Sequence, residues 1–568
     1  MLIFILLISF LKQLSCINVN VKTAHGVLKG VPSLFSESVT EFLGVPYALP
    51  PLGDLRFKKA KPLPCDYYGK GLRVNTYAKA CIQVPNKVEF KGLSSWHPEK
   101  HQMSEDCLQL NIWVPENTTG AVIVFLFGGR YDHGSASLEY YNGNFLAEKT
   151  GAIVVNVNYR LGVFGFAYYR PNDKGGIPGN LGLLDQQLAL RWVRDNIASF
   201  GGDPKKVTLF GQGSGAAMAT AHLFASGSSH LFKRIIASSG TIHHTWATSR
   251  ASYVRQNFEQ LIKNLKCDDG NYVNKIECMR NVSASELALK ASFIKNSNQH
   301  FSQAAFTVID KDEIFFYGNV TSFYRRREFS KNKVDLLIGK TEDEASLFMG
   351  LMLNDPKYKC GINFKNDIES NGNQCNMNEK NYNNVIELIG RNEKLTKKGV
   401  SAIKKLYRKI KNPRERAVRA ISDFGFNCDS DDFASVLKYE GLGNVFYYNF
   451  KKRSPSNPWP KWMGAMHRYD MLYVFGYPFF DPDYYKNNKD VETEQLYSEK
   501  IMGVIGGFAT YGNITREVDN LKETFSDNPA YKNKFVVGNY ESLKFDRNGV
   551  CVDVEFIRAK YRSKRYLC

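Results

Sequence analysis

A glycine-rich segment between a strand-like and a helix-like run is the part of the sequence best suited to chemistry. Residues 207–217 read VTLFGQGSGAA. A strand that turns sharply into a helix can hold an attacking side chain at the tip of the turn, in the pattern G-x-S-x-G, where the flanking glycines let the turn close. In this frame the tip position is Gly213, and the serine follows one place later as Ser214. The sequence therefore predicts an elbow without its nucleophile.

Ser214 has two interpretations. In such an elbow, the residue after the nucleophile contributes its backbone N–H to the oxyanion hole, and its side chain begins the helix. The first interpretation makes Ser214 a small polar residue at a helix N-terminus. The alternative is a displaced nucleophile that still reaches a base.

The surrounding elements that must position this turn alternate between strands and helices. Apolar runs rich in β-branched residues predict buried strands, whereas stripes of apolar residues at helical spacing predict helices. Strands are expected at 121–127, 153–158, 206–210, 234–239 and 334–339, and helices at 184–200, 215–225 and 395–410. This alternation predicts an α/β fold with a large, mostly parallel, twisted sheet and helices on both faces. No linker or repeat interrupts it, so we expect a single domain over 17–568 after a leader.

Several longer motifs give the sequence a family resemblance. In chain order it resembles the type-B carboxylesterase and cholinesterase family, which has the α/β-hydrolase fold, over roughly residues 20 to 560. The runs that carry the resemblance are EFLGVPYA at 41–48, SEDCLQLN at 104–111, NYRLGVFGF at 158–166, GNLGLLDQ at 179–186, FGGDP at 200–204 and VTLFG at 207–211.

The resemblance implies the remaining catalytic positions. The acid of the family matches Glu344 in GKTEDEA, and the general base matches His467 in HRYDMLYVFG. Glu344 would orient the imidazole of His467. With Gly213 at the nucleophile position, this pair is expected to keep a structural role.

The oxyanion loop departs from the family pattern. The matching segment contains Gly128, Gly129 and Arg130, so that an arginine replaces the third glycine. We expect the bulk of Arg130 to enter the gorge; the alternative is a guanidinium that turns to solvent. Gln212 stands where the cholinesterases carry a glutamate, and this removes a negative charge that would favour a cationic substrate.

One residue instead favours the binding of a cationic ligand. Trp96 resembles the choline-binding tryptophan of cholinesterases, whose aromatic face holds a quaternary ammonium group. The alternative is an aromatic residue packed within a loop. The net charge, 75 − 56 = +19, opposes the steering of a cation toward the site.

The ends of the chain and the sequons predict an extracellular protein. Residues 1–16 contain a short apolar run typical of a signal peptide, and no later run is long enough to span a membrane. Four N-x-S/T sequons are candidate glycan acceptors: Asn117, Asn281, Asn319 and Asn513.

The cysteines predict a disulfide framework. The resemblance implies Cys81–Cys107, a short loop implies Cys267–Cys278, the C-terminal region implies Cys428–Cys551, and Cys360 with Cys375 can close on each other. Cys65 and Cys568 remain. Cys568 resembles a cysteine that cross-links cholinesterase dimers, which favours a homodimer, whereas an intramolecular Cys65–Cys568 bond is the alternative.

These observations predict a secreted cholinesterase-like pseudoenzyme. The family includes non-enzymatic members such as the neuroligins, whose elbow also carries glycine. We therefore expect a binding or recognition protein whose partner is an extracellular protein or a small ligand. The alternatives are an active carboxylic ester hydrolase using Ser214 and a basic protein that binds anionic glycans. We expect no metal, organic cofactor or nucleic acid, because no motif for any of them is present.

Overall fold

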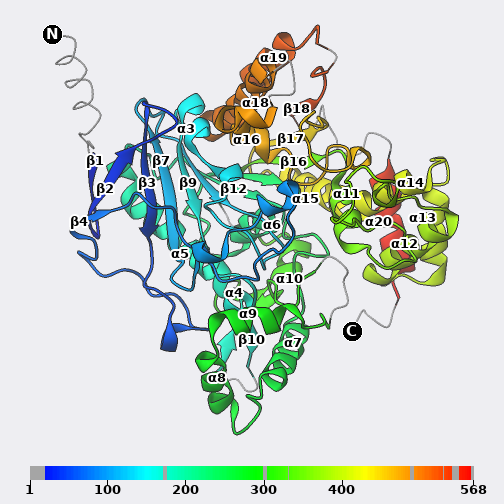
Figure 1. Ribbon diagram of the computed structural model, residues 1–568, viewed down its shortest axis with the longest axis horizontal. Helices are drawn as coiled ribbons and strands as arrows, with labels where there is room; N and C mark the ends of the chain where they lie inside the picture. The colour runs from blue at the N-terminus through cyan, green and yellow to red at the C-terminus, as the bar shows by residue number, and fades with distance from the viewer. Residues whose placement is uncertain are drawn as a thin grey trace.

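A twisted sheet of twelve strands, with helices on both faces, organises the described part of the chain (Figure 1). The computed structural model describes residues 19–170, 175–297, 303–329, 332–485, 491–528, 530–539 and 549–563. The expected signal peptide and Cys568 lie outside these residues. The strands follow the order β1-β2-β3-β7-β9-β8-β12-β13-β16-β17-β18, and β4 pairs with β2. This is the α/β-hydrolase type of architecture that the sequence predicts.

The centre of the sheet is parallel, and its outer strands pair in antiparallel fashion except β4, which is parallel to β2. The parallel strands are β9 (Ile153–Val157), β8 (Val122–Leu126), β12 (Val207–Gln212), β13 (Arg234–Ser238), β16 (Asp335–Thr341) and β17 (Val445–Phe450). The outer strands are β1 (Val19–Thr23), β2 (Gly26–Pro32), β3 (Val39–Pro46), β4 (Gly69–Arg73), β7 (Gln109–Pro115) and β18 (Phe535–Asn539). Strands β8, β9, β12 and β13 are buried along their whole length, as their apolar, β-branched sequences predict.

The register of the central strands aligns their carboxyl ends. Gly211 lies opposite Leu126, Gln212 opposite Ser238, and Ser238 opposite Gly339. The loops that follow β8, β12 and β16 therefore begin at the same edge of the sheet. This is the edge at which open parallel sheets place their sites.

Helices cover the sheet and form two further groups. α3 (Asn144–Thr150) contacts β3, β7, β9 and α18 (Val491–Tyr511), whereas α6 (Ser214–Ala221) lies against β8, β12 and β13. α7 (Ala251–Asn264), α8 (Tyr272–Asn281) and α9 (Ala284–Ser292) gather at the bottom of Figure 1. The other helices include α2 (Lys91–Ser94), α4 (Gly162–Phe166), α5 (Leu181–Asn196), α10 (Val320–Arg325), α15 (Cys428–Tyr439), α16 (Met471–Val474), α17 (Tyr477–Phe480) and α19 (Thr515–Thr524).

Four disulfides connect cysteines of the described residues: Cys81–Cys107, Cys267–Cys278, Cys360–Cys375 and Cys428–Cys551. These are the four pairings expected from the sequence. Cys65 is an exposed thiol with no disulfide partner in the described ranges.

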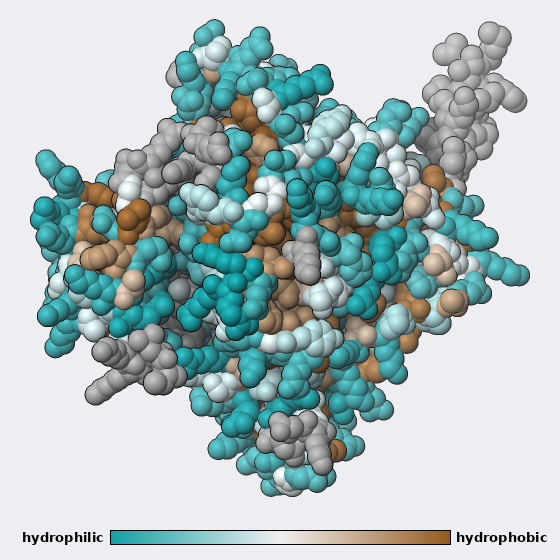
Figure 2. Space-filling view, turned by 180° about the vertical axis from the view of Figure 1, so that it is seen from behind, coloured by the Kyte–Doolittle hydropathy of each residue, from teal (hydrophilic) through white to brown (hydrophobic). Residues whose placement is uncertain are grey.

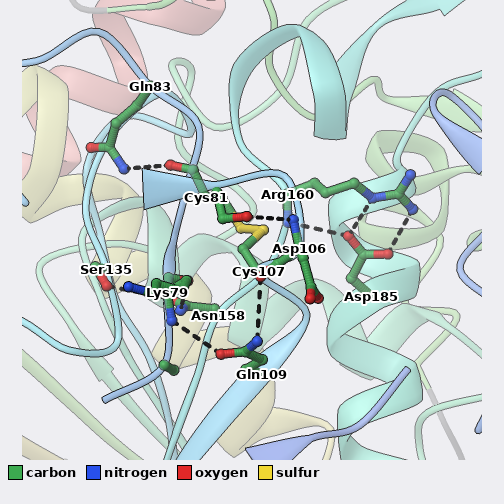
Figure 3. Close-up of a disulfide and its surroundings, with 12 residues drawn as sticks. Lys79, Cys81, Gln83, Asp106, Cys107, Gln109, Ser135, Asn158, Arg160 and Asp185 are labelled. Carbon is green, nitrogen blue, oxygen red and sulfur yellow. Dashed lines mark hydrogen bonds and ion pairs between the residues drawn. A yellow bond between two sulfur atoms is a disulfide. The ribbon is translucent and has the colours of Figure 1, made fainter. Parts of the chain in front are cut away.

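The Cys81–Cys107 bridge lies beside the loop that follows β8 (Figure 3). The side-chain amide of Gln83 donates to the carbonyl oxygens of Cys81 (3.0 Å) and Gly134 (2.9 Å). Its carbonyl accepts from the N–H of Gly134 (2.9 Å). The disulfide segment is thereby tied to the far end of the loop that contains Gly128 and Gly129.

The surface in Figure 2 is mostly hydrophilic, with apolar side chains in patches between polar ones. No helix within the described ranges has the length and apolar character needed to cross a bilayer. Asn117, Asn281 and Asn513 are exposed. Asn319 is half-buried, and its amide donates to Asp310 (3.2 Å) while its carbonyl oxygen caps α10.

A carboxy-terminal helical cluster has its own apolar core. It contains α11 (Glu344–Met352), α12 (Glu379–Asn392), α13 (Lys397–Leu406), α14 (Pro413–Ser422) and α20 (Val550–Tyr561). Figure 1 shows α20 packed among α12, α13 and α14, although it comes more than a hundred residues later. The Cys428–Cys551 bridge joins α15 to α20.

Arg558 on α20 connects this cluster electrostatically. Its guanidinium contacts Asp429 (2.5 Å) and both carboxylate oxygens of Glu393 (3.1 Å each), and all three side chains are buried. Burial raises the pKa of Glu393. Burial acts in the same direction on Asp429, but Arg558 and the nearby histidines hold the pKa of Asp429 below its ordinary value. Removal of Arg558 would leave buried Asp429 without its guanidinium partner, and buried Glu393 with only the more exposed Arg562 (3.6 Å).

We therefore expect Arg558→Met to lower the free energy of unfolding by about 3–5 kcal/mol at pH 7. The difference in stability between the variant and the wild-type protein should become smaller toward about pH 5. Without Arg558 the folded-state pKa values of the buried carboxyl groups are raised, so these groups take up protons in acid and the folded variant is stabilised. Denaturant unfolding across this pH range, with disulfides intact, measures both effects. Lys560→Met removes an exposed cation from the same helix and should change stability by less than about 0.5 kcal/mol. Equal losses in the two variants would mean that Arg558 does not compensate the buried carboxylates.

Candidate functional site

Gly213 forms the tip of a sharp turn between β12 and α6. Its φ of 57° and ψ of −122° lie in a region that L-residues rarely adopt. Its N–H donates to the carbonyl of Ser238 (2.8 Å), and its carbonyl accepts from the N–H of Ala217 (3.0 Å). The glycines on either side are sterically required, since a Cβ on Gly211 would lie 2.2 Å from the carbonyl oxygen of Gly215, and one on Gly215 would lie 2.0 Å from that of Leu126.

Glu344 and His467 form a buried hydrogen-bonded pair beside this turn. Glu344 is the first residue of α11, three places after β16, and its exposed fraction is 0%. Its Oε2 lies 2.5 Å from Nδ1 of His467. Its Oε1 accepts from Ser239 Oγ (2.6 Å) and from the N–H of Thr341 (2.8 Å). Burial alone would raise the pKa of Glu344, but His467 and these donors hold it below its ordinary value.

The Nε2 side of the His467 imidazole faces Gly213. A Cβ placed on Gly213 would lie 3.1 Å from Nε2 of His467. Nε2 instead lies 3.0 Å from the side-chain nitrogen of Gln212. An amide nitrogen can only donate, so Nε2 is the acceptor and Nδ1 carries the proton shared with Glu344. The proton-accepting atom of a general base is thus occupied by Gln212.

The oxyanion loop and Ser214 contact each other. The N–H of Gly129 donates to Oγ of Ser214 (3.1 Å). Both loop glycines are required, because a Cβ on Gly128 would lie 2.3 Å from the carbonyl oxygen of Gln212, and one on Gly129 would lie 2.0 Å from that of His133. The hydroxyl of Ser214 therefore takes the place that a substrate oxygen would take on Gly129 N–H.

Arg130 has a left-handed backbone conformation (φ 53°), and its side chain lines the cavity beside Gly213. Its Nε is buried and has no hydrogen-bond partner in the part of the chain that the structure describes. Burial would raise the pKa of Asp132, but the charge of Arg130 and the contacts with His133 hold it below its ordinary value. Arg130 is thus one of the residues that line this cavity, and an effect of its bulk on the gorge stays a prediction.

The face of Trp96 is covered by a cation from the chain itself. Trp96 is 5% exposed and stacks on Trp459 with ring centroids 5.5 Å apart. The guanidinium of Arg468 lies 5.0 Å from the centre of the Trp96 ring and 5.2 Å from that of Tyr141. Its Nε donates to the hydroxyl of Tyr141 (2.6 Å). The surface that would hold a quaternary ammonium group is therefore occupied.

These residues surround a cavity of about 200 Å³, here named the elbow cavity. Its walls include Trp96, Arg130, Gly213, Ser214, His467 and Arg468, and its apolar lining includes Trp246, Leu347, Phe348, Leu351, Met352 and Phe426. Rings of Phe348 and Phe426 lie 5.0 and 5.3 Å from that of His467. A second cavity of about 480 Å³ shares Arg130, His97 and His133 with it.

The structure brings together the residues singled out in the sequence and adds two that sequence reasoning missed. The residues that meet at one edge of the sheet are Gly128, Gly129, Arg130, Gly213, Ser214, Glu344, His467 and Trp96. The missed residues are Ser239, which donates to Glu344, and Arg468; for Gln212, the sequence did not indicate the contact with His467. Arg468 directly follows His467, and a charged residue next to an expected general base is a signal that could have found it. Within the described ranges, no group of three or more acidic, histidine or cysteine side chains could hold a metal.

Comparisons with known proteins agree with this architecture. The family model described as the carboxylesterase family matches residues 17–548. The chain is 36% identical over 514 residues to acetylcholinesterase 4 of Caenorhabditis briggsae, covering 86% of this chain and 81% of the relative. It is 33% identical over 502 residues to the cholinesterase of Mus musculus (87% and 79% covered) and 31% identical over 548 residues to the acetylcholinesterase of Danio rerio (89% and 82%). The chain belongs to the carboxylesterase family.

Proposed function

We propose that this chain is a secreted, catalytically inactive member of the carboxylesterase family that acts as a binding or recognition protein. The observation that carries the proposal is Gly213 at the tip of the elbow, facing Nε2 of His467 with no side chain between them. Loss of the nucleophile of a serine triad costs on the order of 10⁶ in turnover. Nothing else in the cavity can offset a loss of this size.

Two further contacts support inactivity. Gln212 occupies the basic nitrogen of His467, and Ser214 occupies the N–H of Gly129. A free oxyanion donor is worth ~10²–10³ in rate. The proton acceptor and one oxyanion donor are thus both used inside the chain.

The same contacts argue against an active ester hydrolase that uses Ser214. A nucleophile must share a hydrogen bond with its base. Oγ of Ser214 is hydrogen-bonded to Gly129, and Nε2 of His467 to Gln212. Ser214 is also the first residue of α6, so its side chain starts the helix, as its sequence position predicts.

Acetylcholine is a poor candidate ligand, although relatives are named acetylcholinesterases. Arg468 already covers Trp96, and a second cation in contact with the same ring would be repelled by it. A retained fold with an altered cavity fits recognition of a different ligand or of a protein partner.

Extracellular location rests on three observations. The sequence begins with an apolar run typical of a signal peptide, the described residues contain four disulfides, and the sequons at Asn117, Asn281 and Asn513 are exposed. Disulfides persist in oxidising compartments. We propose a single domain over 17–568, and homodimer formation through Cys568 stays a prediction.

Organophosphate labelling tests the loss of the nucleophile. A fluorophosphonate should leave the wild-type protein unlabelled and should label Gly213→Ser at position 213, because the new hydroxyl lies beside Nε2 of His467. Peptide mapping by mass spectrometry locates the adduct, and hydrolysis of p-nitrophenyl acetate gives the rate.

Two controls sharpen this test. Gly213→Ala introduces the Cβ without the hydroxyl and should stay unlabelled. Adding Ser214→Ala to Gly213→Ser should raise hydrolysis about tenfold or more, because it frees the Gly129 N–H for the substrate. An adduct on Ser214 of the wild-type chain, or wild-type hydrolysis at ordinary esterase rates, would falsify the proposal.

The backbone of the elbow predicts a stability effect. Gly213→Ala and Gly213→Ser should both lower the free energy of unfolding by about 1–3 kcal/mol, because φ is 57° and ψ is −122° at this position. Gly503→Ala is the matched control, since Gly503 lies within α18 with open space at its Cβ; it should raise stability by about 0.5–1 kcal/mol. Denaturant unfolding measures all three. A neutral Gly213→Ala would mean that the turn is not strained.

A further inference from the structure

The elbow cavity combines cations that have unpartnered N–H groups with an apolar lining. Arg468 is 6% exposed, and its Nη2 is buried without a hydrogen-bond partner among the described residues. Nε of Arg130 is likewise buried and has no hydrogen-bond partner among the described residues. A buried polar group that lacks a partner costs free energy, and for a charged group the cost is larger. Both side chains line the cavity, so an acceptor that a ligand brings beside them would supply a partner.

The charges around the cavity favour an anion. Its walls include two guanidinium groups, and no carboxylate lines it within the residues that the structure describes. Two acids close to the cavity already have partners: Glu344 bonds to His467, and Asp132 bonds to His133 (2.6 Å) and also interacts with the charge of Arg130. Arg468 is therefore the main cation of the cavity, and Arg130 the weaker one. Burial, reinforced by His133 and Arg468, lowers the pKa of His97 to about 3, so this wall residue is neutral.

Ser214 marks where an oxygen fits. Its Oγ accepts from the N–H of Gly129, at the floor of the same cavity. A ligand oxygen can replace this neutral hydroxyl, and a charged oxygen forms the stronger hydrogen bond. Guanidinium groups likewise bind carboxylates through paired N–H groups.

The apolar side chains of the cavity restrict the polarity and the size of the rest of the ligand. Trp246, Phe348, Phe426 and neighbouring aliphatic side chains surround the space, which favours an apolar or aromatic body. A volume of about 200 Å³ equals that of roughly seven liquid water molecules, at ~30 Å³ each. The ligand must therefore be small.

We propose that the elbow cavity binds a small monocarboxylate with an aromatic or short apolar body, its carboxylate held by Arg468 and Arg130. This inference deepens the proposed binding role and rests on it. A Trp96 ring without Arg468 above it would favour a cationic ligand. Because the guanidinium of Arg468 already lies over this ring, the cavity instead favours an anionic ligand.

The test compares three probes of similar size and different charge. Phenylacetate should bind the wild-type protein at least tenfold more tightly than phenylacetamide, and benzyltrimethylammonium should bind most weakly. Calorimetry gives the affinities, and quenching of tryptophan fluorescence reports occupancy, since Trp96 and Trp246 line the cavity.

Arg468→Gly is the decisive variant. Residue 468 has φ 77°, a conformation that glycine adopts without strain, so the variant should fold. It should lose at least tenfold in phenylacetate affinity and gain at least tenfold in benzyltrimethylammonium affinity, because the face of Trp96 becomes free. Arg130→Gly, also at positive φ, should weaken phenylacetate alone.

Arg327→Gly is the matched control. Arg327 is an exposed arginine with φ 59°, outside the cavity, and its substitution should change neither affinity. The proposal fails if wild-type protein does not bind phenylacetate at millimolar concentrations, if it prefers the ammonium probe, or if Arg468→Gly leaves phenylacetate binding unchanged. Each of these outcomes is independent of the labelling experiment, so a wrong ligand class is distinguishable from a wrong assignment of inactivity.

Discussion

The hydrogen bond between Glu344 and His467 is the interaction on which the rest of the site depends. It joins the residue that begins α11 to the loop after β17, and both start from strand ends that the parallel register brings to one edge. Because Glu344 is fully buried and also accepts from Ser239 and Thr341, the imidazole has one orientation. That orientation directs Nε2 at Gly213. The imidazole is therefore held in one place, beside a residue that has no side chain.

With glycine at position 213, the polar groups around the turn find their partners in other side chains, since buried polar groups need partners. Gln212 satisfies the imidazole, Ser214 satisfies the oxyanion loop, and Arg468 covers the exposed face of Trp96. Each of these side chains belongs to a residue adjacent to a motif position. These contacts leave a cavity in which many polar groups have partners, whereas Arg130 and Arg468 each have a buried nitrogen without one among the described residues.

The backbone strain at the elbow depends on which residue stands at its tip. Enzymes of this kind hold a serine in a strained turn because the chemistry requires it. Gly213 adopts the same backbone conformation without a Cβ, so the strain is absent and the fold is free of that cost. Meanwhile the carboxy-terminal helical cluster, joined by Cys428–Cys551 and by Arg558, holds α11 and with it Glu344. The same elements thus support both the stability of the fold and the geometry of the site.

The sequence by itself determined the fold class, the central strands and the position of Gly213, because these depend on local patterns. The family resemblance implied Glu344, His467 and the Cys81–Cys107 pair, because its motifs match at those positions. Strand and helix limits at β8, β12 and α6 differ from the expected limits by only a few residues. Only the tertiary structure decided what Gln212, Ser214 and Arg468 contact. Their partners, which are His467, Gly129 and Trp96 in that order, lie 255, 85 and 372 positions away along the chain. Side-chain direction at a turn depends on φ and ψ and on packing from several strands, and neither quantity is encoded in the spacing of residues along one segment.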